Sequence, residues 1–571
     1  MASARPELAD RYYLDNFELL IAGTRRYHRL FPAEQAQQLA QFQALSEAAQ
    51  RLLVRLLGRK GVWFRQSKLR YGDINDMAQA LAELSEQQLL VSGLPPRDIW
   101  LQQVTLPELN QLPVINDAGL QRLPKAVLIQ TLLASDDDCD SDGWLVQANQ
   151  QLDERWWQIQ CQGLLQLLQL LYFGNRNQDL TQFVVSELGL QRFEQYRLDA
   201  STQSFQQTDE LQTALNLAQL ADEWDELLRQ KLPLDPIDFY QRLPKPQVQP
   251  QLERRRQRLV AHLGRSAERL NLWEFAVACY QQCQAWAANE RHCRVLQQQL
   301  KLTPTVAIAE QLAQALNQLW LSASNEAAQQ VAHRLAKRSL PLLAPLCAEP
   351  TLTALAKPLV AANHLAGQQQ SLQLNADFIA AAPRVELRTA AYFEAQGYHV
   401  FFCENALLNG LFGLALWDII FSPVAGAFHH PYQRAPQDMY SVSFYEQRAE
   451  AIEQRLAAIR AGDTAIIWRH FTEKQGLQND WVNWSLLTET LLTAALAAFS
   501  PQFLYDVMRR LLKDPKHYRS GQPDLVLFSG EGECRFIEVK GPGDSLSDHQ
   551  GYWLQFLGRY YPAELYFVDY A

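Results

Sequence analysis

The amino-acid sequence predicts a multidomain, mainly α-helical protein that ends in an α/β domain. The chain has 571 residues, which is more than one ordinary hydrophobic core organises, so three or four domains are expected. Apolar residues recur at three- and four-residue spacing through most of residues 1–371. From residue 372 onward, short apolar runs typical of strands alternate with helical segments.

The composition is that of a globular protein, with 48% hydrophobic and 20% charged residues. The net charge of -10 argues weakly against general polyanion binding, although local patches set the field at a binding groove. The N-terminus lacks a signal-peptide pattern, and no apolar run is long enough for a membrane span. The eight scattered cysteines form no C-x2-C pair, which indicates reduced thiols. We therefore expect a soluble, cytoplasmic protein without a membrane partner, and the sequence shows no P-loop that would imply ATP.

Residues 1–95 are predicted to form an N-terminal helical region that binds DNA. The segment 32–64, "PAEQAQQLAQFQALSEAAQRLLVRLLGRKGVWF", has helical spacing, and Pro32 suits a helix start. Pro95 and Pro96 end this region. Residues 96–205 are rich in Leu and Pro, with a helix opened by Pro124, and are predicted to form a small helical module and a linker.

Residues 206–371 are rich in Gln, Leu and Ala and have helical periods with short breaks. Segments such as "RSAERLNLWEFAVACYQQC" and "NERHCRVLQQQLKL" predict antiparallel helix pairs, and therefore an α-solenoid of stacked repeats. Because the repeat pattern is degraded, plain helical packing is the alternative. A solenoid surface could also hold a protein partner.

Residues 372–571 are predicted to form an α/β domain. The strands are expected at "HVFFCEN", "PDLVLFS", "CRFIEVKG" and "AELYFVDY", and helices at residues 383–398 and 545–561. Ser545 or Ser547 is the expected N-cap of the second of these helices. The run "GLFGLALWDIIF" is expected to be buried.

Three charged residues are placed on strands that otherwise appear buried. Side chains alternate along a strand, so Glu538 and Lys540 point to the same face. The turn "SGEGE" can fold the preceding strand back as a hairpin, which puts Asp524 beside Glu538. Two buried carboxylates repel each other unless a cation joins them, and Mg²⁺ or Mn²⁺ is the natural cation for oxygen ligands.

This arrangement suits metal-assisted hydrolysis of a phosphodiester bond, with Lys540 orienting or deprotonating the attacking water. The alternative is a salt-bridged surface hairpin in which Lys540 pairs with Glu538 or Asp524.

The residues that follow favour the nuclease interpretation. The segment 538–554, "EVKGPGDSLSDHQGYWL", resembles the signature of the VRR-NUC nucleases, a branch of the PD-(D/E)xK superfamily. The resemblance implies a restriction-endonuclease-like fold for residues 372–571. It also implies that Asp524, Glu538 and the Val539 carbonyl bind the metal, that Lys540 is catalytic, and that Gln550 supports the site.

A second segment, "FFCENALLNGLFGLALWDIIF" at 401–421, resembles the Fanconi-associated nuclease family. The resemblance implies that Glu404 is a further ligand for one or two Mg²⁺ or Mn²⁺ ions. It also implies a SAP-like module in residues 96–205 and a TPR-like solenoid in residues 206–371. The implied activity is that of a 5′-flap endonuclease and 5′-to-3′ exonuclease on branched or flapped DNA, in interstrand-crosslink repair.

Two differences from animal members of that family are visible. No Cys/His cluster with ligand spacing lies near the N-terminus, so the chain resembles the shorter bacterial form, which would associate with the nucleoid when bound to DNA. Animal members carry a Lys at the position of His549, where it is thought to help hold a 5′ phosphate, and this substitution puts that pocket in doubt.

Basic residues concentrate between residues 51 and 70 without an intervening acid, and Trp63, Phe64 and Tyr71 lie among them. This pattern suits phosphate contacts with stacking on an unpaired base, although a solvated helix face is the alternative. Arg519 lies shortly before Asp524 and the strand that Asp524 begins, and it is a further candidate for contact with a DNA phosphate. The predicted DNA-binding residues are Arg51, Arg55, Arg59, Lys60, Arg65, Lys68, Arg70 and Arg519.

Two other functions remain open from the sequence. A Holliday-junction resolvase would use the same catalytic residues on a different junction. A non-catalytic DNA-binding adaptor would carry a relic nuclease domain, but the intact Asp524, Glu538 and Lys540 argue against that alternative.

Overall fold

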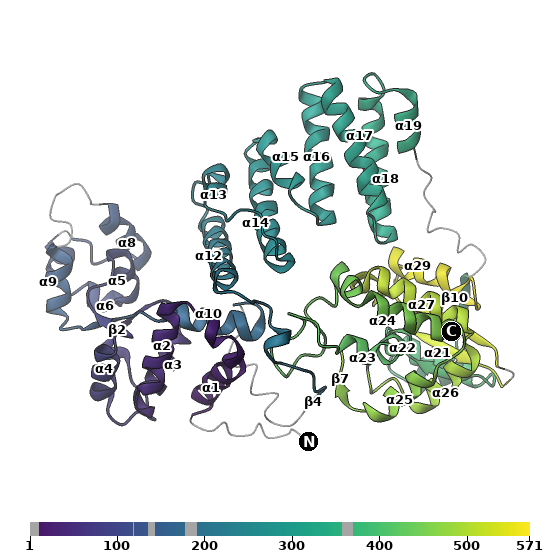
Figure 1. The fold of residues 1–571 in the computed structure, drawn as a ribbon, viewed down its shortest axis with the longest axis horizontal. Coiled ribbons are helices and arrows are strands. Elements are labelled where there is room, and N and C mark those ends of the chain that lie inside the picture. The colour runs from purple at the N-terminus through teal and green to yellow at the C-terminus, as the bar shows by residue number, and fades with distance from the viewer. Residues whose placement is uncertain are drawn as a thin grey trace. The chain divides into compact units, whose positions relative to one another are not determined.

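The computed structural model describes residues 11–117, 119–134, 143–176, 191–356, 369–530 and 532–570. The chain divides into two compact units (Figure 1). The first consists of Met1–Leu190 with Phe205–Leu215, and the second of Gln191–Ser204 with Asn216–Ala571. The four-domain boundaries expected from the sequence remain a prediction.

The first unit contains short helices and one small sheet. The strands β1 (Trp63–Arg65), β3 (Trp156–Ile159) and β2 (Leu90–Ser92) are antiparallel and lie in the order β1-β3-β2. The helices are α1 Tyr12–Thr24, α2 Ala33–Ala44, α3 Glu47–Leu57, α4 Met77–Glu86, α5 Arg97–Gln103, α6 Leu106–Leu109, α7 Pro113–Asp117, α8 Lys125–Ala134, α9 Gly143–Gln151 and α10 Gln162–Phe173. As expected from Pro124, α8 begins at the next residue.

The helix α3 shows how the local sequence determines where a helix of the first unit begins and which face it buries. Ser46 is its N-cap and accepts a hydrogen bond from the Ala49 backbone N–H at 3.4 Å. Leu52, Leu53 and Leu56 are buried on one side of this helix, while its arginines lie on the half-exposed side.

The first part of the second unit is a series of helices in which each packs on the next (Figure 1). This arrangement confirms the predicted helical solenoid. The helices are α12 Thr208–Gln230, α13 Pro236–Gln241, α14 Pro250–Arg269, α15 Trp273–Gln281, α16 Trp286–Leu302, α17 Val306–Leu321, α18 Glu326–Leu343 and α19 Glu349–Leu355. Thr305 and Asn325 cap α17 and α18 by accepting hydrogen bonds from Ile308 and Ala328.

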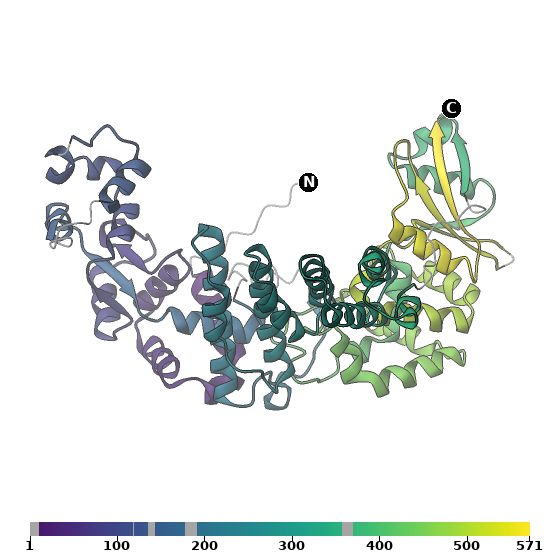
Figure 2. The same cartoon turned by 90° about the horizontal axis from the view of Figure 1, so that it is seen from above.

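The second part of this unit is built on a five-stranded sheet of order β5-β10-β9-β8-β6. The strands are β5 Gln369–Leu374, β6 His399–Phe402, β8 Leu525–Phe528, β9 Cys534–Lys540 and β10 Ala563–Tyr570. β10 is parallel to both β5 and β9, whereas β8 is antiparallel to β9 and β6. β10 is the yellow arrow that ends at the C label in Figure 2, and it lies inside the sheet. All four strands predicted for this domain are present, and β5 was not predicted.

Helices surround the sheet and carry most of the core. They are α20 Ala376–Ala381, α21 Val385–Glu394, α22 Leu407–Ala415, α23 Trp417–Ile420, α24 Val442–Arg460, α25 Ala465–Glu473, α26 Glu489–Ala498, α27 Pro501–Lys513, α28 Pro515–Tyr518 and α29 Asp548–Leu557. Two short strands, β4 (Arg192–Phe193) and β7 (Leu477–Gln478), pair in parallel.

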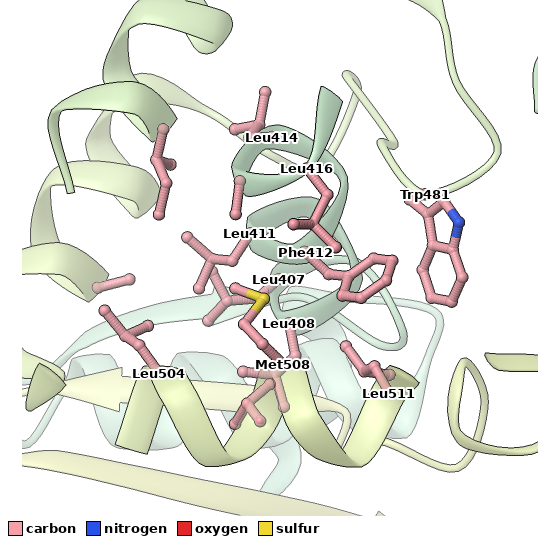
Figure 3. Close-up of a cluster of buried hydrophobic side chains, with 14 of the residues drawn as sticks. Leu407, Leu408, Leu411, Phe412, Leu414, Leu416, Trp481, Leu504, Met508 and Leu511 are labelled. Carbon is pink, nitrogen blue, oxygen red and sulfur yellow. The ribbon is translucent and has the colours of Figure 1, made fainter. Parts of the chain in front are cut away.

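The helix α22 lies at the centre of the largest core, as its apolar sequence predicts (Figure 3). Leu411 and Phe412 point toward Leu504 and Met508 of α27 and toward Trp481 in the loop after β7 (Figure 3). Two glycines of α22 allow this loop to come close. A Cβ atom at Gly410 would lie 2.7 Å from Leu487, and one at Gly413 would lie 2.7 Å from Trp481.

Among the described residues, no single helix is long and apolar enough to cross a membrane. The helices α26 and α27 together have sufficient length and apolar composition, but a bend of 112° separates them.

Candidate active site

The predicted hairpin brings Asp524 and Glu538 together. β8 and β9 are antiparallel with Leu525 opposite Ile537, so Asp524, just before β8, lies across from Glu538. Oδ2 of Asp524 accepts a hydrogen bond from the Val539 backbone N–H at 2.9 Å. The exposed fractions are 7% for Asp524 and 1% for Glu538. Both carboxyl groups are therefore held out of water by the sheet itself.

Lys540 and Gln550 complete a closed set of contacts around Glu538. The Lys540 ammonium lies 3.0 Å from Oε1 of Glu538 and 3.1 Å from Oε1 of Gln550. Nε2 of Gln550 donates a hydrogen bond to the same Glu538 oxygen. Gln550 is in turn fixed by a capping box with Ser547 at the start of α29, so one of the two predicted N-caps is the observed one.

Burial and mutual repulsion disfavour the charged form of both carboxyl groups. Burial raises the pKa of Asp524 to about 6, and the Glu404 and Glu386 carboxylates add to this effect. Burial also raises the pKa of Glu538 to about 8, with Asp524 as the next cause and Lys540 acting in the opposite direction. Without a cation the pair therefore keeps a proton at neutral pH, and a bound cation would release it.

Glu404 approaches from the loop between β6 and α22. Its neighbour Cys403 donates a backbone hydrogen bond to the Asp524 carbonyl at 2.9 Å, which ties this loop to the start of β8. Unlike the other two carboxylates, Glu404 is exposed. Glu386, on α21, is half-buried and lies close enough to affect the pKa of Asp524.

Two amide side chains that the sequence reasoning missed hold the Glu404 loop in place. Asn409, which is 6% exposed, donates hydrogen bonds from Nδ2 to the carbonyls of Asn405 and Arg519, both at 2.7 Å. Its Oδ1 accepts a hydrogen bond from Gln522 at 2.8 Å. For Asn409 the sequence signal was a polar residue inside an apolar run, which is typical of buried hydrogen-bonding groups, whereas Gln522 lies in a polar stretch and gave no such signal.

The candidate ligand atoms suit a hard divalent cation, because they are carboxylate oxygens. Two of the carboxyl groups, those of Asp524 and Glu538, are buried, and the single charge of Lys540 balances them only in part. In the described part of the chain, however, no three Asp, Glu, His or Cys side chains are already grouped as a metal site. Lys540 and Gln550 both contact Oε1 of Glu538. A metal ion that binds through this oxygen would replace these contacts. The metal-ligand roles of Glu404, Asp524, Glu538 and Val539 stay predictions.

Asp418, in the buried run "GLFGLALWDIIF", is not part of the site. Its carboxylate pairs with Arg455 at 2.8 Å, and this contact opposes the effect of burial and leaves the pKa of Asp418 below its usual value.

His549 stacks on His517 with 4.1 Å between ring centroids. Burial, followed by the effects of His517 and Arg510, lowers the pKa of His549 to about 4. The ring is therefore neutral at physiological pH, so this position carries no positive charge.

The predicted basic residues of the first unit differ in exposure. Four are exposed at the end of α3 and in the following segment: Arg59, Lys60, Lys68 and Arg70. Two are half-buried and already paired: Arg51 with Glu47 at 2.8 Å and Arg55 with Asp73 at 3.0 Å. The four exposed cations are the most accessible to a DNA phosphate, and the contact of all six residues with DNA stays a prediction.

The prediction that Arg65 contacts DNA is wrong. Its side chain is 4% exposed and lies 2.7 Å from Glu108 and 2.8 Å from Glu154. A guanidinium that is buried and neutralised by two carboxylates has a structural role. The local sequence did not reveal this, because both partners are distant in the chain.

Arg519 lies beside the Glu404 loop rather than in the open. Nη2 donates a hydrogen bond to the Asp480 carbonyl at 3.0 Å, and Nη1 donates to the Tyr440 hydroxyl. Neither acceptor is a carboxylate, so these two hydrogen bonds do not neutralise the guanidinium. Its contact with DNA stays a prediction.

Comparison with known proteins identifies families that match two parts of the chain. Residues 11–91 match the family model described as "FAN1, HTH domain", and residues 461–568 match the VRR-NUC domain. Asp524, Glu538, Lys540 and Gln550 lie inside the second match, while Glu404 lies before it.

Relatives and solved structures cover nearly the whole chain. A Fanconi-associated nuclease 1 homolog from Pseudomonas aeruginosa is 32% identical over 95% of this chain and 93% of its own. The homolog from Arabidopsis thaliana is 26% identical over 97% of this chain and 66% of its own. The crystal structure of paFAN1 bound to 2nt 5′flap DNA with gap matches with a TM-score of 0.74 and 30% identity, over 100% of this chain and 99% of that one. From the hairpin geometry and these matches, the chain belongs to the Fanconi-associated nuclease family.

Proposed function

We propose that this structure-specific DNA nuclease, which uses a divalent metal ion, acts on 5′-flapped DNA as an endonuclease and a 5′-to-3′ exonuclease in interstrand-crosslink repair. The observation that carries the proposal is the buried Asp524–Glu538–Lys540 hairpin, in a chain whose solved relatives are bound to 5′flap DNA. The protein would act in the cytoplasm, at the nucleoid.

In this proposal Glu404, Asp524, Glu538 and the Val539 carbonyl hold one or two ions. When bound, Mg²⁺ or Mn²⁺ supplies Lewis-acid stabilisation of the phosphate charge and lowers the pKa of water. Glu538 and Asp524 then lose the proton that burial favours. The strand geometry supports this role, because the Val539 N–H already fixes one Asp524 oxygen and leaves the other for a ligand.

Lys540 positions the attacking water and stabilises charge on the phosphate. Its ammonium is oriented by the two oxygens that it contacts, on Glu538 and Gln550. Because Gln550 is locked to the start of α29, it keeps Lys540 directed toward the site when Glu538 turns to its ligand role.

The DNA duplex would contact the first unit through Arg51, Arg55, Arg59, Lys60, Lys68 and Arg70, and Arg519 would contact phosphates near the site. These side chains supply charge without base specificity, as a nuclease that recognises structure rather than sequence requires.

The test uses purified protein with end-labelled 5′-flap, 3′-flap, four-way-junction and duplex DNA, each with Mg²⁺, Mn²⁺ or EDTA. Asp524→Asn removes a proposed ligand charge, and Asp418→Asn is the matched control because Asp418 pairs with Arg455 away from the site. We expect metal-dependent cutting of the 5′ flap by the wild type and by the control, and none by Asp524→Asn.

Preference for the four-way junction would replace the flap assignment with a resolvase. DNA binding without any cutting would make the protein an adaptor. For the repair role, a strain without the gene is expected to be sensitive to a crosslinking agent and to be rescued by the wild type but not by Asp524→Asn.

A further inference from the structure

The strand β10 places an aromatic side chain next to the candidate catalytic lysine. β10 is parallel to β9, and in the register of the two strands Phe567 lies opposite Lys540, just as Leu565 lies opposite Glu538. Neighbouring strands are about 4.8 Å apart, and the side chains of residues paired in this way point to the same face of the sheet. The Phe567 ring is therefore on the face that carries Lys540 and Glu538.

Phe567 is exposed where its neighbours in β10 are buried. It is 37% exposed, and of the phenylalanines that the structure describes it is the only exposed one. Two residues earlier on the same face, Leu565 is buried in the core that contains Trp553 of α29. On the other face, Val568 is buried with Val539. The core under α29 therefore ends at Leu565, and Phe567 belongs to neither of these two cores.

The position of Phe567 distinguishes it from other exposed apolar residues. Single apolar side chains are common on protein surfaces and need no special explanation. Phe567, however, is one strand away from Lys540, whose ammonium is held at the candidate active site by Glu538 and Gln550. An apolar surface thus adjoins the group that would stabilise charge on the scissile phosphate.

The chemistry of DNA determines what this surface would meet. The groups bonded to a phosphate on either side are deoxyribose rings, and the bases lie farther away. A phosphate held by Lys540 would therefore bring a neighbouring sugar to the ring of Phe567, one strand spacing of about 4.8 Å away. The C2′ atom of this sugar carries only hydrogen in DNA, whereas in RNA it carries a hydroxyl group.

We propose that Phe567 packs against the deoxyribose next to the scissile phosphate and selects DNA over RNA at that nucleotide, an inference that rests on the proposed nuclease function. The apolar C2′ of deoxyribose fits against the phenyl ring. A 2′-hydroxyl in the same place would lose water without gaining a partner, because a phenyl ring has no hydrogen-bonding group. Phe567 is thus a specificity-determining residue of the active-site face.

The experiment uses a 5′-flap substrate in which one nucleotide at a time, on either side of the cut, is replaced by a ribonucleotide or by a 2′-fluoro nucleotide. The fluorine favours the sugar pucker of RNA but requires no hydrogen-bond partner. We measure single-turnover cleavage with Mn²⁺ for the wild type, Phe567→Ala, Phe567→Leu and Tyr570→Ala. Tyr570→Ala is the matched control, because Tyr570 is 39% exposed and lies on the opposite face of the same strand.

We expect the wild type and Tyr570→Ala to lose about tenfold in cleavage rate with a ribonucleotide at one position, the scale of one hydroxyl without a partner. The 2′-fluoro nucleotide at that position should be cut nearly as fast as DNA. Phe567→Leu keeps an apolar surface and should keep the discrimination. Phe567→Ala lets water reach the hydroxyl, so its ribonucleotide and DNA rates should agree within about twofold. Thermal melting checks that each variant is folded.

Three results would overturn the inference: equal cleavage of DNA and ribonucleotide substrates by the wild type at every position, full ribonucleotide discrimination in folded Phe567→Ala, or an equal loss with the 2′-fluoro nucleotide, which would assign the effect to sugar pucker. In each case, flap cutting of the all-DNA substrate by the wild type leaves the proposed function intact. If the wild type cuts no DNA, the proposed function fails, and the inference is decided by the equilibrium affinities of the same substrates.

Discussion

At the scale of single residues, the catalytic candidates were predictable because their contacts are local. Asp524, Glu538 and Lys540 belong to one hairpin, and the alternation of a strand suffices to place them on one face. Arg65 was assigned to DNA because its own segment is purely basic. Glu108 and Glu154 neutralise it from other segments, so a local charge pattern could not show the pairing.

Arg65→Ala is expected to destabilise the first unit strongly. The Glu154 side chain is 3% exposed and would lose its cation, which costs about 3–5 kcal/mol. Urea unfolding measures the difference, with Arg70→Ala as the exposed control, for which we expect less than about 0.5 kcal/mol. An Arg65→Ala protein as stable as the control would show that the buried ion pair contributes nothing.

Glu108 gives this ion pair a predictable pH dependence. The Arg65 hydrogen bond lowers the pKa of Glu108 to about 2, below its usual value of 4.5 in the unfolded chain. A lowered folded-state pKa stabilises the fold above the unfolded pKa, and this contribution disappears as pH falls toward the folded one. The stability gap between wild type and Glu108→Gln should therefore be full at pH 7 and shrink between about pH 4.5 and 2. A gap that stays constant over that range would contradict the assignment.

At the scale of elements, most helices and the buried strands of residues 372–571 followed their apolar periods. The three strands of the first unit were not predicted in segments expected to be helical, and neither was β5. Its sequence, "QQSLQL", is mostly polar because it forms the edge of the sheet, and four of its six residues are exposed. Its partner β10 lies at the other end of the domain in sequence, so no local sequence pattern indicates the pairing. The hydrogen bond between Asn409 and Gln522 was missed for the same reason.

Gly413→Ala tests the close approach between α22 and the loop after β7. The added Cβ would lie 2.7 Å from Trp481 and from Val482, so the loop must move. Such overpacking costs about 1–3 kcal/mol. We expect lower thermal stability and slower flap cutting, because the same loop lines a pocket beside Glu404.

Gly530→Ala is the control for this substitution, since a Cβ there meets no atom within 4 Å. If both variants melt together with the wild type, the contact between α22 and the loop is not tight.

At the scale of the whole molecule, the sequence predicted a helical solenoid before an α/β nuclease domain, and the two are joined within the second unit. Asp514 accepts hydrogen bonds at 2.7 Å from Ser324 and Asn325 at the start of α18, and it also caps α28. Glu326 of the same helix contacts Tyr518 and Arg510 of the nuclease part at 2.7 Å and 2.9 Å. These contacts could not be predicted from the sequence, because the apolar periodicity of each part is accounted for by packing within that part.

Asp514→Ala should loosen this junction. It removes a helix cap and two inter-element hydrogen bonds, a loss of about 2–4 kcal/mol if each contributes about 1 kcal/mol. Calorimetry of the intact protein should show a lower melting temperature, and limited proteolysis should cut faster near residue 324. Asp548→Ala is the comparison, because Asp548 lies in the first turn of α29 and, within the described part of the chain, has no hydrogen bond or ion pair with α18. Equal melting of the two variants would mean that Asp514 does not join the parts.

The position of β10 inside the sheet has a consequence for how the enzyme is made. Ribosomes deliver Asp524, Glu538 and Lys540 before they deliver the strand that covers the far side of β9. Until residues 563–570 emerge, β9 has an open edge and β5 has no partner. A polypeptide released early would carry every proposed catalytic side chain on an incomplete sheet, so we expect truncated products of translation to lack nuclease activity.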